Sequence, residues 1–433
     1  MTAEIVVMNK EGIALAADSA VTHQGEGAQK VFHTANKIFA LSKYEPVGVM
    51  VYGSASFMGV PWETIVKTYR RQLRKRRFPH LGQYATDLRQ FLARNRTLFP
   101  AEQQHRYAQS HIYGYLRYFI RREIDEQVKD SLARQGPLSD SDVRAIASRV
   151  VSRYRDSWRQ ARLVVGMTNA HRRRVLDKYA NVIRRAKKQV FENLLTSGTS
   201  RKVTQIVADY FVKFAGVSPD SSGVVVAGFG TRDVFPALAP CMVDGIVLGK
   251  MRFRKEEAVE ISFDNSASIV PFAQGEMVST FMEGVNPEYQ RAIEADFSEV
   301  VRAYGDIVVD SIDALGEQAK TKLKRSLKDI RDKSLGEYYN RLEGHRKDKY
   351  VSPVLDVLAM LPKDELAAMA EALVDLTRFR QRVTKEAETV AGPIDVAVIS
   401  KGDGLIWMKR KHYFAGELNP QFFANYYREG GNG

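Results

Sequence analysis

Three polar residues near the start of the sequence could take part in chemistry: Thr2, Glu4 and Asp18. Together with the terminal amine they would supply a hydroxyl and two carboxylates. Two carboxylates that face one another repel and are stable only around a cation. We therefore expect a lysine from a later strand to complete the group.

A β-hairpin is expected to bring these residues together. Apolar runs predict strands at residues 3–8 and 13–21, and residues 9–12 between them have the composition of a turn. Gly12 is expected to take a positive φ in that turn, since glycine adopts this conformation at little cost.

The register of the hairpin decides which polar groups meet. If Asn9 faces Ile13, then Glu4 faces Asp18. Because side chains alternate with a period of two, one face of the hairpin then gathers Thr2, Glu4, Asp18 and Ala20. A slip of one residue would scatter them.

Length and composition limit the kinds of protein that this chain can be. A chain of 433 residues can form two or three domains, or one domain with large insertions. Cys241 is the only cysteine, so no internal disulfide can form, which fits a reducing compartment. No apolar run is long enough to span a membrane, and the start lacks the pattern of a signal peptide. We expect a cytoplasmic protein that does not act at a membrane.

The formal net charge of +14 has two interpretations. One is a solvated, arginine-rich surface, and the other is an acidic partner such as nucleic acid. Residues 171–190 contain eight Lys or Arg and one acidic residue, and residues 69–77 contain six more basic residues. The first of these segments also has an apolar stripe at helical spacing, formed by Val175, Tyr179, Val182, Ala186 and Val190.

Strand signals fall into three blocks, at residues 3–53, 222–275 and 393–409, and helical patterns fill residues 62–215 and 277–390. The last block holds only two strands and cannot form a stable sheet alone. One sheet-forming domain with two helical insertions is therefore the economical interpretation. The expected segments are core residues 1–98, 219–284 and 362–415, a basic helical insertion at 99–218, a second helical insertion at 285–361, and a tail at 416–433.

Several helix boundaries can be predicted from single residues. Pro61 predicts a kink or a late helix start at Trp62. Asp140 is a plausible N-cap, and Pro362 is expected to lead into a helix. Cys241 is expected to be a buried strand thiol.

Four stretches, in this order, resemble the proteasome β-subunit family and its bacterial relatives, the N-terminal nucleophile hydrolases. They are "TAEIVVMNKEGIALAADSAVT", similar to that family's first hairpin, "NKIFAL", similar to its lysine-bearing third strand, "VYGSAS", similar to its glycine turn, and "AGPIDVAVISKGDGLIWM", similar to its final hairpin. The matched core covers about half of the chain, and the helical stretches have no counterpart in the family.

This resemblance implies a four-layer αββα sandwich and a threonine-type amidohydrolase, most simply a peptidase with peptide or protein substrates. Thr2 would be the nucleophile once Met1 is removed, with its own α-amine as base. Lys37 would lower the pKa of that amine, Asp18 would hold the Lys37 ammonium, and the backbone N–H of Gly53 would stabilise the oxyanion. The family also implies a homo-oligomer, and no cofactor or metal is expected.

The sequence departs from the family pattern at two places. The turn in which the family presents a serine before its third helix has Gly275 and Glu276 here. Near the last strand Glu386 or Glu388 would replace the family's aspartate, and a second serine is absent.

Other interpretations of these residues stay open. Thr2 is common after Met1 because small residues permit methionine removal, Asp18 could cap a turn, and Lys37 could be a solvent-facing lysine. Lys30 is a second candidate lysine, but residues 25–30 read as a loop. The alternative function is an inactive hydrolase-like scaffold whose basic helical insertion binds a protein or nucleic acid.

Overall fold

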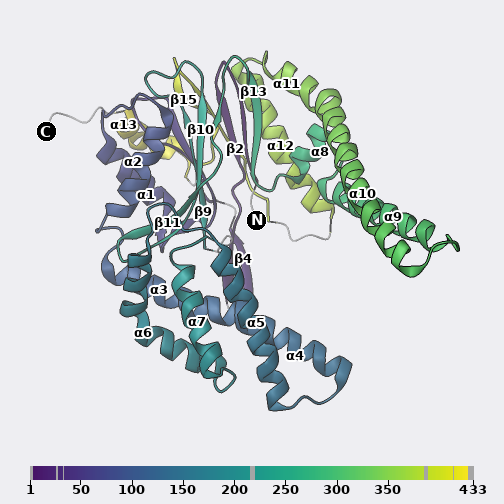
Figure 1. The fold of residues 1–433 in the computed structure, drawn as a ribbon. Helices are drawn as coiled ribbons and strands as arrows, with labels where there is room; N and C mark the ends of the chain where they lie inside the picture. Colours follow the sequence, from purple (N-terminus) through teal and green to yellow (C-terminus); the bar gives the residue numbers. More distant parts are fainter. Residues whose placement is uncertain are drawn as a thin grey trace. The chain divides into compact units, whose positions relative to one another are not determined.

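The computed structural model describes residues 3–25, 28–32, 34–214, 220–384, 389–412 and 414–427 (Figure 1). The described chain is a mixed α/β protein with antiparallel sheets. None of its described helices combines the length and apolarity needed to cross a bilayer. The chain forms two compact units: unit 1 contains Met1–Ile38, Val234–Pro236 and Glu260–Gly433, and unit 2 contains Phe39–Asp233 and Ala237–Val259.

Unit 1 is built on a five-stranded sheet with the strand order β13-β1-β2-β14-β15. The strands are β1 (Ala3–Asn9), β2 (Ile13–Ala17), β13 (Ala267–Ala273), β14 (Asp395–Ser400) and β15 (Gly404–Lys409). β1 and β2 are buried along their whole length. Helix α12 (Lys363–Val383) packs Leu366, Ala370 and Val374 into one apolar cluster with Ile5 and Val7 of β1.

The hairpin of β1 and β2 has a register one residue away from the expected one. Glu4 pairs with Ala17, and the N–H of Asn9 donates to the carbonyl of Gly12 at 3.1 Å. The Asn9 side chain accepts the N–H two residues further on at 2.8 Å, and this local hydrogen bond favours a two-residue loop. The expected cross-strand pairing of Glu4 with Asp18 is therefore wrong.

Gly12 does not have the expected positive φ. A glycine is instead needed here because another strand lies very close to its Cα. A Cβ at this position would lie 2.7 Å from the carbonyl oxygen of Ile399 on the neighbouring strand β14. We expect Gly12→Ala to destabilise the protein by about 1–3 kcal/mol, because the two backbones would have to separate. Urea unfolding measures this change.

The matched control for this prediction is Gly402→Ala, in the turn between β14 and β15. A Cβ at Gly402 meets no atom within 4 Å, and its φ is not positive either. That substitution should be neutral or stabilise by up to about 1 kcal/mol. Equal effects of the two substitutions would contradict the close approach at Gly12.

The sequence pattern predicts one strand at residues 13–21, but in the structure β2 ends at Ala17. A two-stranded hairpin follows, formed by β3 (Val21–Gly25) and β4 (Ala28–Phe32). Lys30 lies on β4, so the loop expected at residues 25–30 is wrong in the part that the structure describes. Glycine-rich composition favoured a loop there, but a hairpin needs turn residues only at its tip.

The remaining elements of unit 1 are mainly helical. They are α8 (Glu276–Glu283), α9 (Pro287–Asp310), α10 (Glu317–Arg346), the π-helical turn η2 (Lys347–Val351), α11 (Ser352–Leu358), α12 (Lys363–Val383), the 3₁₀ turn η3 (Gly416–Leu418) and α13 (Pro420–Tyr427). α12 begins directly after Pro362, which confirms that prediction. α9 and α10 lie side by side as a long hairpin (Figure 1).

Unit 2 contains a second sheet with the order β11-β10-β9-β6-β5, and β12 pairs with β10. Its strands are β5 (Ile38–Ala40), β6 (Val47–Gly53), β9 (Ser222–Gly228), β10 (Ala237–Val247), β11 (Lys250–Lys255) and β12 (Val259–Glu260), with a small separate hairpin of β7 (Ser56–Phe57) and β8 (Val60–Pro61). The strands of the sheet come from two of the three blocks that the sequence pattern predicts, whereas β7 and β8 lie just after the first block.

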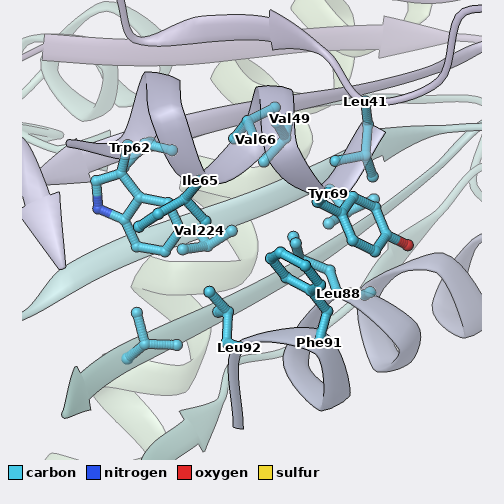
Figure 2. Close-up of a cluster of buried hydrophobic side chains, with 14 of the residues drawn as sticks. Leu41, Val49, Trp62, Ile65, Val66, Tyr69, Leu88, Phe91, Leu92 and Val224 are labelled. Atoms are coloured by element: carbon cyan, nitrogen blue, oxygen red, sulfur yellow. The ribbon is translucent and has the colours of Figure 1, made fainter. Parts of the chain in front are cut away.

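Helices α1 (Trp62–Leu73) and α2 (Leu81–Arg94) form one apolar core with this sheet, shown in Figure 2. α1 starts at Trp62 after Pro61, which confirms the late start. The Trp62 indole N–H donates to Ser222 Oγ at 2.9 Å, and the Tyr69 hydroxyl donates to Asp87 at 2.8 Å. Both large rings are thus buried with their polar atoms satisfied.

The rest of unit 2 is a helical region with its own apolar core. It contains α3 (Ala101–Tyr115), the π-helical turn η1 (Leu116–Arg121), α4 (Arg122–Gln135), α5 (Asp140–Gln160), α6 (Asn169–Phe191) and α7 (Ser197–Tyr210). Ser139, not Asp140, caps α5, because its hydroxyl accepts the N–H of Asp142 in a capping box. On α6 the predicted stripe is buried except for Val182, and Ile183 is buried beside it.

Candidate active site

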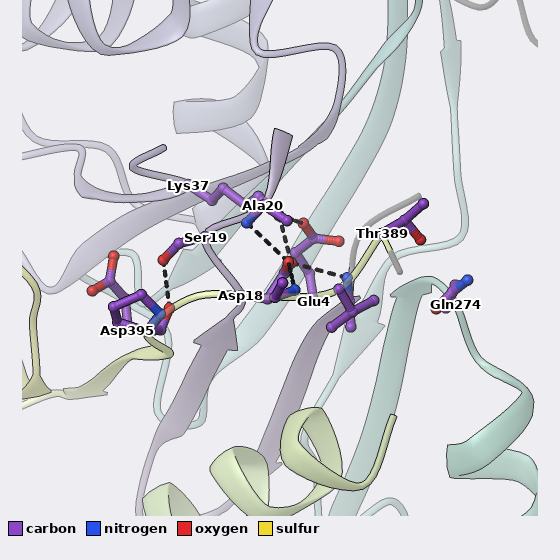
Figure 3. Close-up of polar contacts among 12 residues, drawn as sticks. Glu4, Asp18, Ser19, Ala20, Lys37, Gln274, Thr389 and Asp395 are labelled. Carbon is purple, nitrogen blue, oxygen red and sulfur yellow. Dashed lines mark hydrogen bonds and ion pairs between the residues drawn. The ribbon is translucent and has the colours of Figure 1, made fainter. Parts of the chain in front are cut away.

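A buried group of three charged side chains lies at the start of β1 (Figure 3). Glu4 and Asp18 are fully buried, and Lys37 is 5 % exposed. Lys37 Nζ lies 2.5 Å from Asp18 Oδ1 and 3.0 Å from Glu4 Oε1. Lys37 is therefore the cation that the two buried carboxylates require. The predicted contact between Lys37 and Asp18 is present in the structure.

The carboxylates of Glu4 and Asp18 both reach Lys37, although the two residues are not cross-strand partners. Asp18 follows the last residue of β2, Ala17, so the strand alternation no longer fixes the direction of its side chain. The N–H of Asp18 donates to the carbonyl of Ala3 at 3.2 Å, and the Asp18 carboxylate returns to accept the N–H of Ala3 at 3.1 Å. This pair of hydrogen bonds ties the first described residue of the chain to the charged group.

Three backbone N–H groups orient the Asp18 carboxylate. Besides Ala3, the N–H of Ala20 lies 3.0 Å and the N–H of Ala391 lies 3.2 Å from Oδ2. Hydrogen bonds to an ionised group are stronger than those between neutral groups. Asp18 therefore joins β1, the segment after β2 and the segment before β14 around the Lys37 ammonium.

The segment before β14 is itself held by a buried glutamine of α12. Gln381 Oε1 accepts the N–H groups of Thr389 at 2.9 Å and Val390 at 2.8 Å. Its Nε2 donates to Gln274 Oε1 at 2.7 Å, beside the turn at Gly275. These hydrogen bonds position the Ala391 N–H that binds Asp18, a role that the sequence pattern did not indicate.

A second buried ion pair lies near the first. Lys411 Nζ pairs with Asp395, and the Lys411 N–H donates to Asp395 Oδ1 at 2.9 Å. Burial lowers the pKa of Lys411, and the nearby Lys37 charge lowers it further, while the Asp395 and Asp18 carboxylates raise it. In the sequence, Asp395 can be noticed as a carboxylate that begins the apolar strand β14. No sequence pattern points to Lys411 as its partner.

Ser19 anchors the loop that carries Asp18. Its hydroxyl donates to the carbonyl of Pro393, and its N–H donates to the carbonyl of Ala391 at 3.2 Å. The serine of "ADS" thus has a structural role in this chain, and it contributes to the fixed position of Asp18.

The other predicted site residues are not all brought together in the described structure. Thr2 lies outside the described residues, as do Glu386 and Glu388. Gly53 ends β6 in unit 2 with φ +79°, and a Cβ there would lie 2.7 Å from the carbonyl of Ser221. The sharp turn expected at Gly53 is confirmed, while its contribution to an oxyanion site stays a prediction.

Cys241 is a buried thiol on β10, as expected. Burial raises its pKa to about 11, so it is a thiol rather than a nucleophilic thiolate near neutral pH. Over the described ranges, no cluster of three or more His, Cys, Asp or Glu side chains is arranged to hold a metal ion.

Neither a scan against protein-family models nor a search of curated proteins finds a match for this sequence. The buried group of Glu4, Asp18 and Lys37 can hold one ammonium in a fixed position beside the start of β1. A fixed cation of this kind can favour the neutral form of a neighbouring amine and stabilise developing negative charge.

Proposed function

We propose that this chain is a threonine-type N-terminal nucleophile amidohydrolase that cleaves peptide bonds after removal of Met1. The observation that carries the proposal is the bond between the Ala3 N–H and Asp18, the residue that also holds Lys37. Thr2 directly precedes Ala3 in the chain, and we propose that its hydroxyl and α-amine act beside the Lys37 ammonium.

In the proposed reaction the α-amine of Thr2 takes the proton of its own hydroxyl, and the oxygen attacks the scissile carbonyl. The Gly53 N–H stabilises the oxyanion, a contribution of about 3 kcal/mol for such donors. The protonated amine then gives its proton to the leaving amine, and water hydrolyses the resulting ester. Lys37 keeps the α-amine neutral at the start, and Asp18 keeps Lys37 in place.

The proposal includes the four-layer αββα arrangement of the N-terminal nucleophile hydrolases. Two antiparallel sheets, each with helices packed on it, support this part. The experiment is hydrolysis of a panel of fluorogenic peptide amides by the protein expressed with a free Thr2, with Thr2→Ala as control. Cleavage that depends on Thr2 supports the proposal, and cleavage that is equal in both proteins overturns it.

A second candidate function is binding of an acidic polymer by the basic helices of unit 2. On α6, Arg173, Arg174, Arg184 and Arg185 are exposed and form no ion pair with a described residue. Arg172 and Lys187, by contrast, have structural partners, because Arg172 binds the buried Asp209 and Lys187 binds Ser200 and Thr204. These four arginines, together with the exposed Lys178 and Lys188 of the same helix, are therefore available to phosphates.

We expect nucleic acid to bind this face with an affinity that falls steeply with salt and depends little on base sequence. Changing the four exposed arginines of α6 to Gln should reduce the slope of log affinity against log salt by about one for each phosphate that the variant no longer binds. Fluorescence anisotropy with DNA and RNA at several salt concentrations measures it.

The control variant removes the same charge elsewhere in the helical region: Lys129, Arg134, Arg144 and Arg149, all exposed and changed to Gln. If both variants bind alike, or if the wild-type protein does not bind at low salt, this face is a solvated surface or contacts protein.

A further inference from the structure

The hairpin of α9 and α10 leaves most of its apolar surface exposed. Only Val309 of α9 and Leu335 of α10 are buried. The two helices are joined by the Ser298–Tyr339 hydroxyl contact at 2.9 Å and by the rings of Phe297 and Tyr338 at 5.0 Å. A two-helix hairpin alone buries little surface, so such a face indicates an interaction site.

The exposed stripe on α9 has the spacing of a helix-packing seam. Ile293, Phe297, Val300, Tyr304 and Ile307 follow one another at intervals of four, three, four and three residues, as the a and d positions of a heptad do. Val300, Tyr304 and Ile307 are 63 %, 70 % and 64 % exposed. Large apolar side chains at these positions normally pack against another helix.

A groove of about 380 Å³ continues this stripe onto α10. It is lined by Phe297, Val301 and Tyr304 of α9 and by Leu327, Ile330 and Tyr338 of α10. Ile330 is 62 % exposed, so α10 contributes to the same open face.

The charges of the two helices indicate the occupant. α9 carries six acidic and two basic residues, a formal charge of −4, and α10 carries nine Lys or Arg and five acidic residues, a formal charge of +4. Asp310 and Lys324 form an ion pair between them, at 2.7 Å. Asp296, Glu299 and Asp306 form no ion pair with any described residue.

We propose that the hairpins of two copies of this chain pack together as a four-helix bundle, with α9 of one copy against α10 of the other. Opposite charges meet in this pairing, whereas α9 against α9 would bring two acidic helices together. The heptad stripe of α9 and Ile330 of α10 then form the apolar core of the bundle. This pairing does not depend on the proposed catalytic activity.

The first test is the mass of the full chain in solution by sedimentation and light scattering. Wild-type protein should form multiples of 48.9 kDa, and Val300→Glu with Ile307→Glu should raise the dissociation constant at least about 100-fold. The control, Ala295→Glu with Arg302→Gln, adds the same negative charge to α9 at exposed positions outside the heptad stripe. A monomeric wild type, or equal association of both variants, would overturn the proposal.

The second test identifies the partner as another copy. One variant reverses Asp296, Glu299 and Asp306 to Lys, and the other reverses Lys322, Arg325 and Lys328 to Glu. Each variant alone should fail to associate, because its α9 and α10 carry charge of the same sign. Mixing them should restore the association, since each α9 then meets an oppositely charged α10. Mixtures that stay dissociated while wild type associates contradict the α9–α10 pairing.

Discussion

Thr2→Ala is expected to abolish peptide-bond hydrolysis, with a loss of at least about 10⁴-fold. The substitution removes the hydroxyl that forms the covalent bond to the substrate, and no other group in the proposed reaction can replace it. Because the methyl group of alanine is small, the α-amine and the buried charges beside Ala3 should be retained. Initial rates on a fluorogenic peptide amide, with purified protein at matched concentration, measure the loss.

Thr2→Ser is the matched control for this substitution. It keeps a hydroxyl on the same carbon and removes only a methyl group, so part of the activity should remain. Full activity of Thr2→Ala would place the catalytic group elsewhere in the chain or in a contaminating enzyme. Equal loss in Thr2→Ser and Thr2→Ala would show that the effect does not come from the hydroxyl.

Lys37→Met is expected to lower the hydrolysis rate at least about 10²-fold and to destabilise the fold by about 3–5 kcal/mol. Lys37 is the cation between Glu4 and Asp18, which are both fully buried. Its loss leaves two buried carboxylates without their ammonium, and it also removes the charge that the proposed reaction uses to keep the Thr2 α-amine neutral. Asp18→Asn should reduce activity in the same way, since it breaks the same ion pair.

A triple variant separates the catalytic effect of Lys37 from its structural effect. Lys37→Met combined with Glu4→Gln and Asp18→Asn removes all three charges, so the fold should regain much of the stability lost in Lys37→Met. Urea unfolding measures that recovery, and peptide hydrolysis should stay low. A triple variant that recovers both stability and activity would show that Lys37 acts only as a structural cation.

The parts of the fold that sequence predicts well are those with a strong local cause. Pro61 and Pro362 fix helix starts because proline cannot occupy a helix interior without cost. The sequence predicts a sharp turn at Gly53, and this residue has a positive φ. The contact between Asp18 and Lys37 is also predicted, because the motifs that contain these residues resemble those of the N-terminal nucleophile hydrolases.

The features that the sequence does not predict are the register of the first hairpin, which a local side-chain hydrogen bond sets, and the contacts between segments that are separate in the sequence. The register of β1 and β2 is shifted by one residue because the Asn9 side chain closes a shorter loop. Asp18 still reaches Lys37 because it lies beyond the strand, where alternation no longer applies. The Asp395–Lys411 pair and the Gln381 hydrogen bonds link residues that no local pattern connects.

In the proposed reaction Thr2 becomes the first residue of the chain and acts as the nucleophile. Intact mass spectrometry of protein expressed in its own host, before and after a threonine-reactive electrophile, tests both parts. We predict a mass that lacks one methionine residue and a single adduct, which tandem spectra place on Thr2 and which Thr2→Ala does not form. Retention of Met1 in most molecules, or an adduct that persists in Thr2→Ala, would contradict the account.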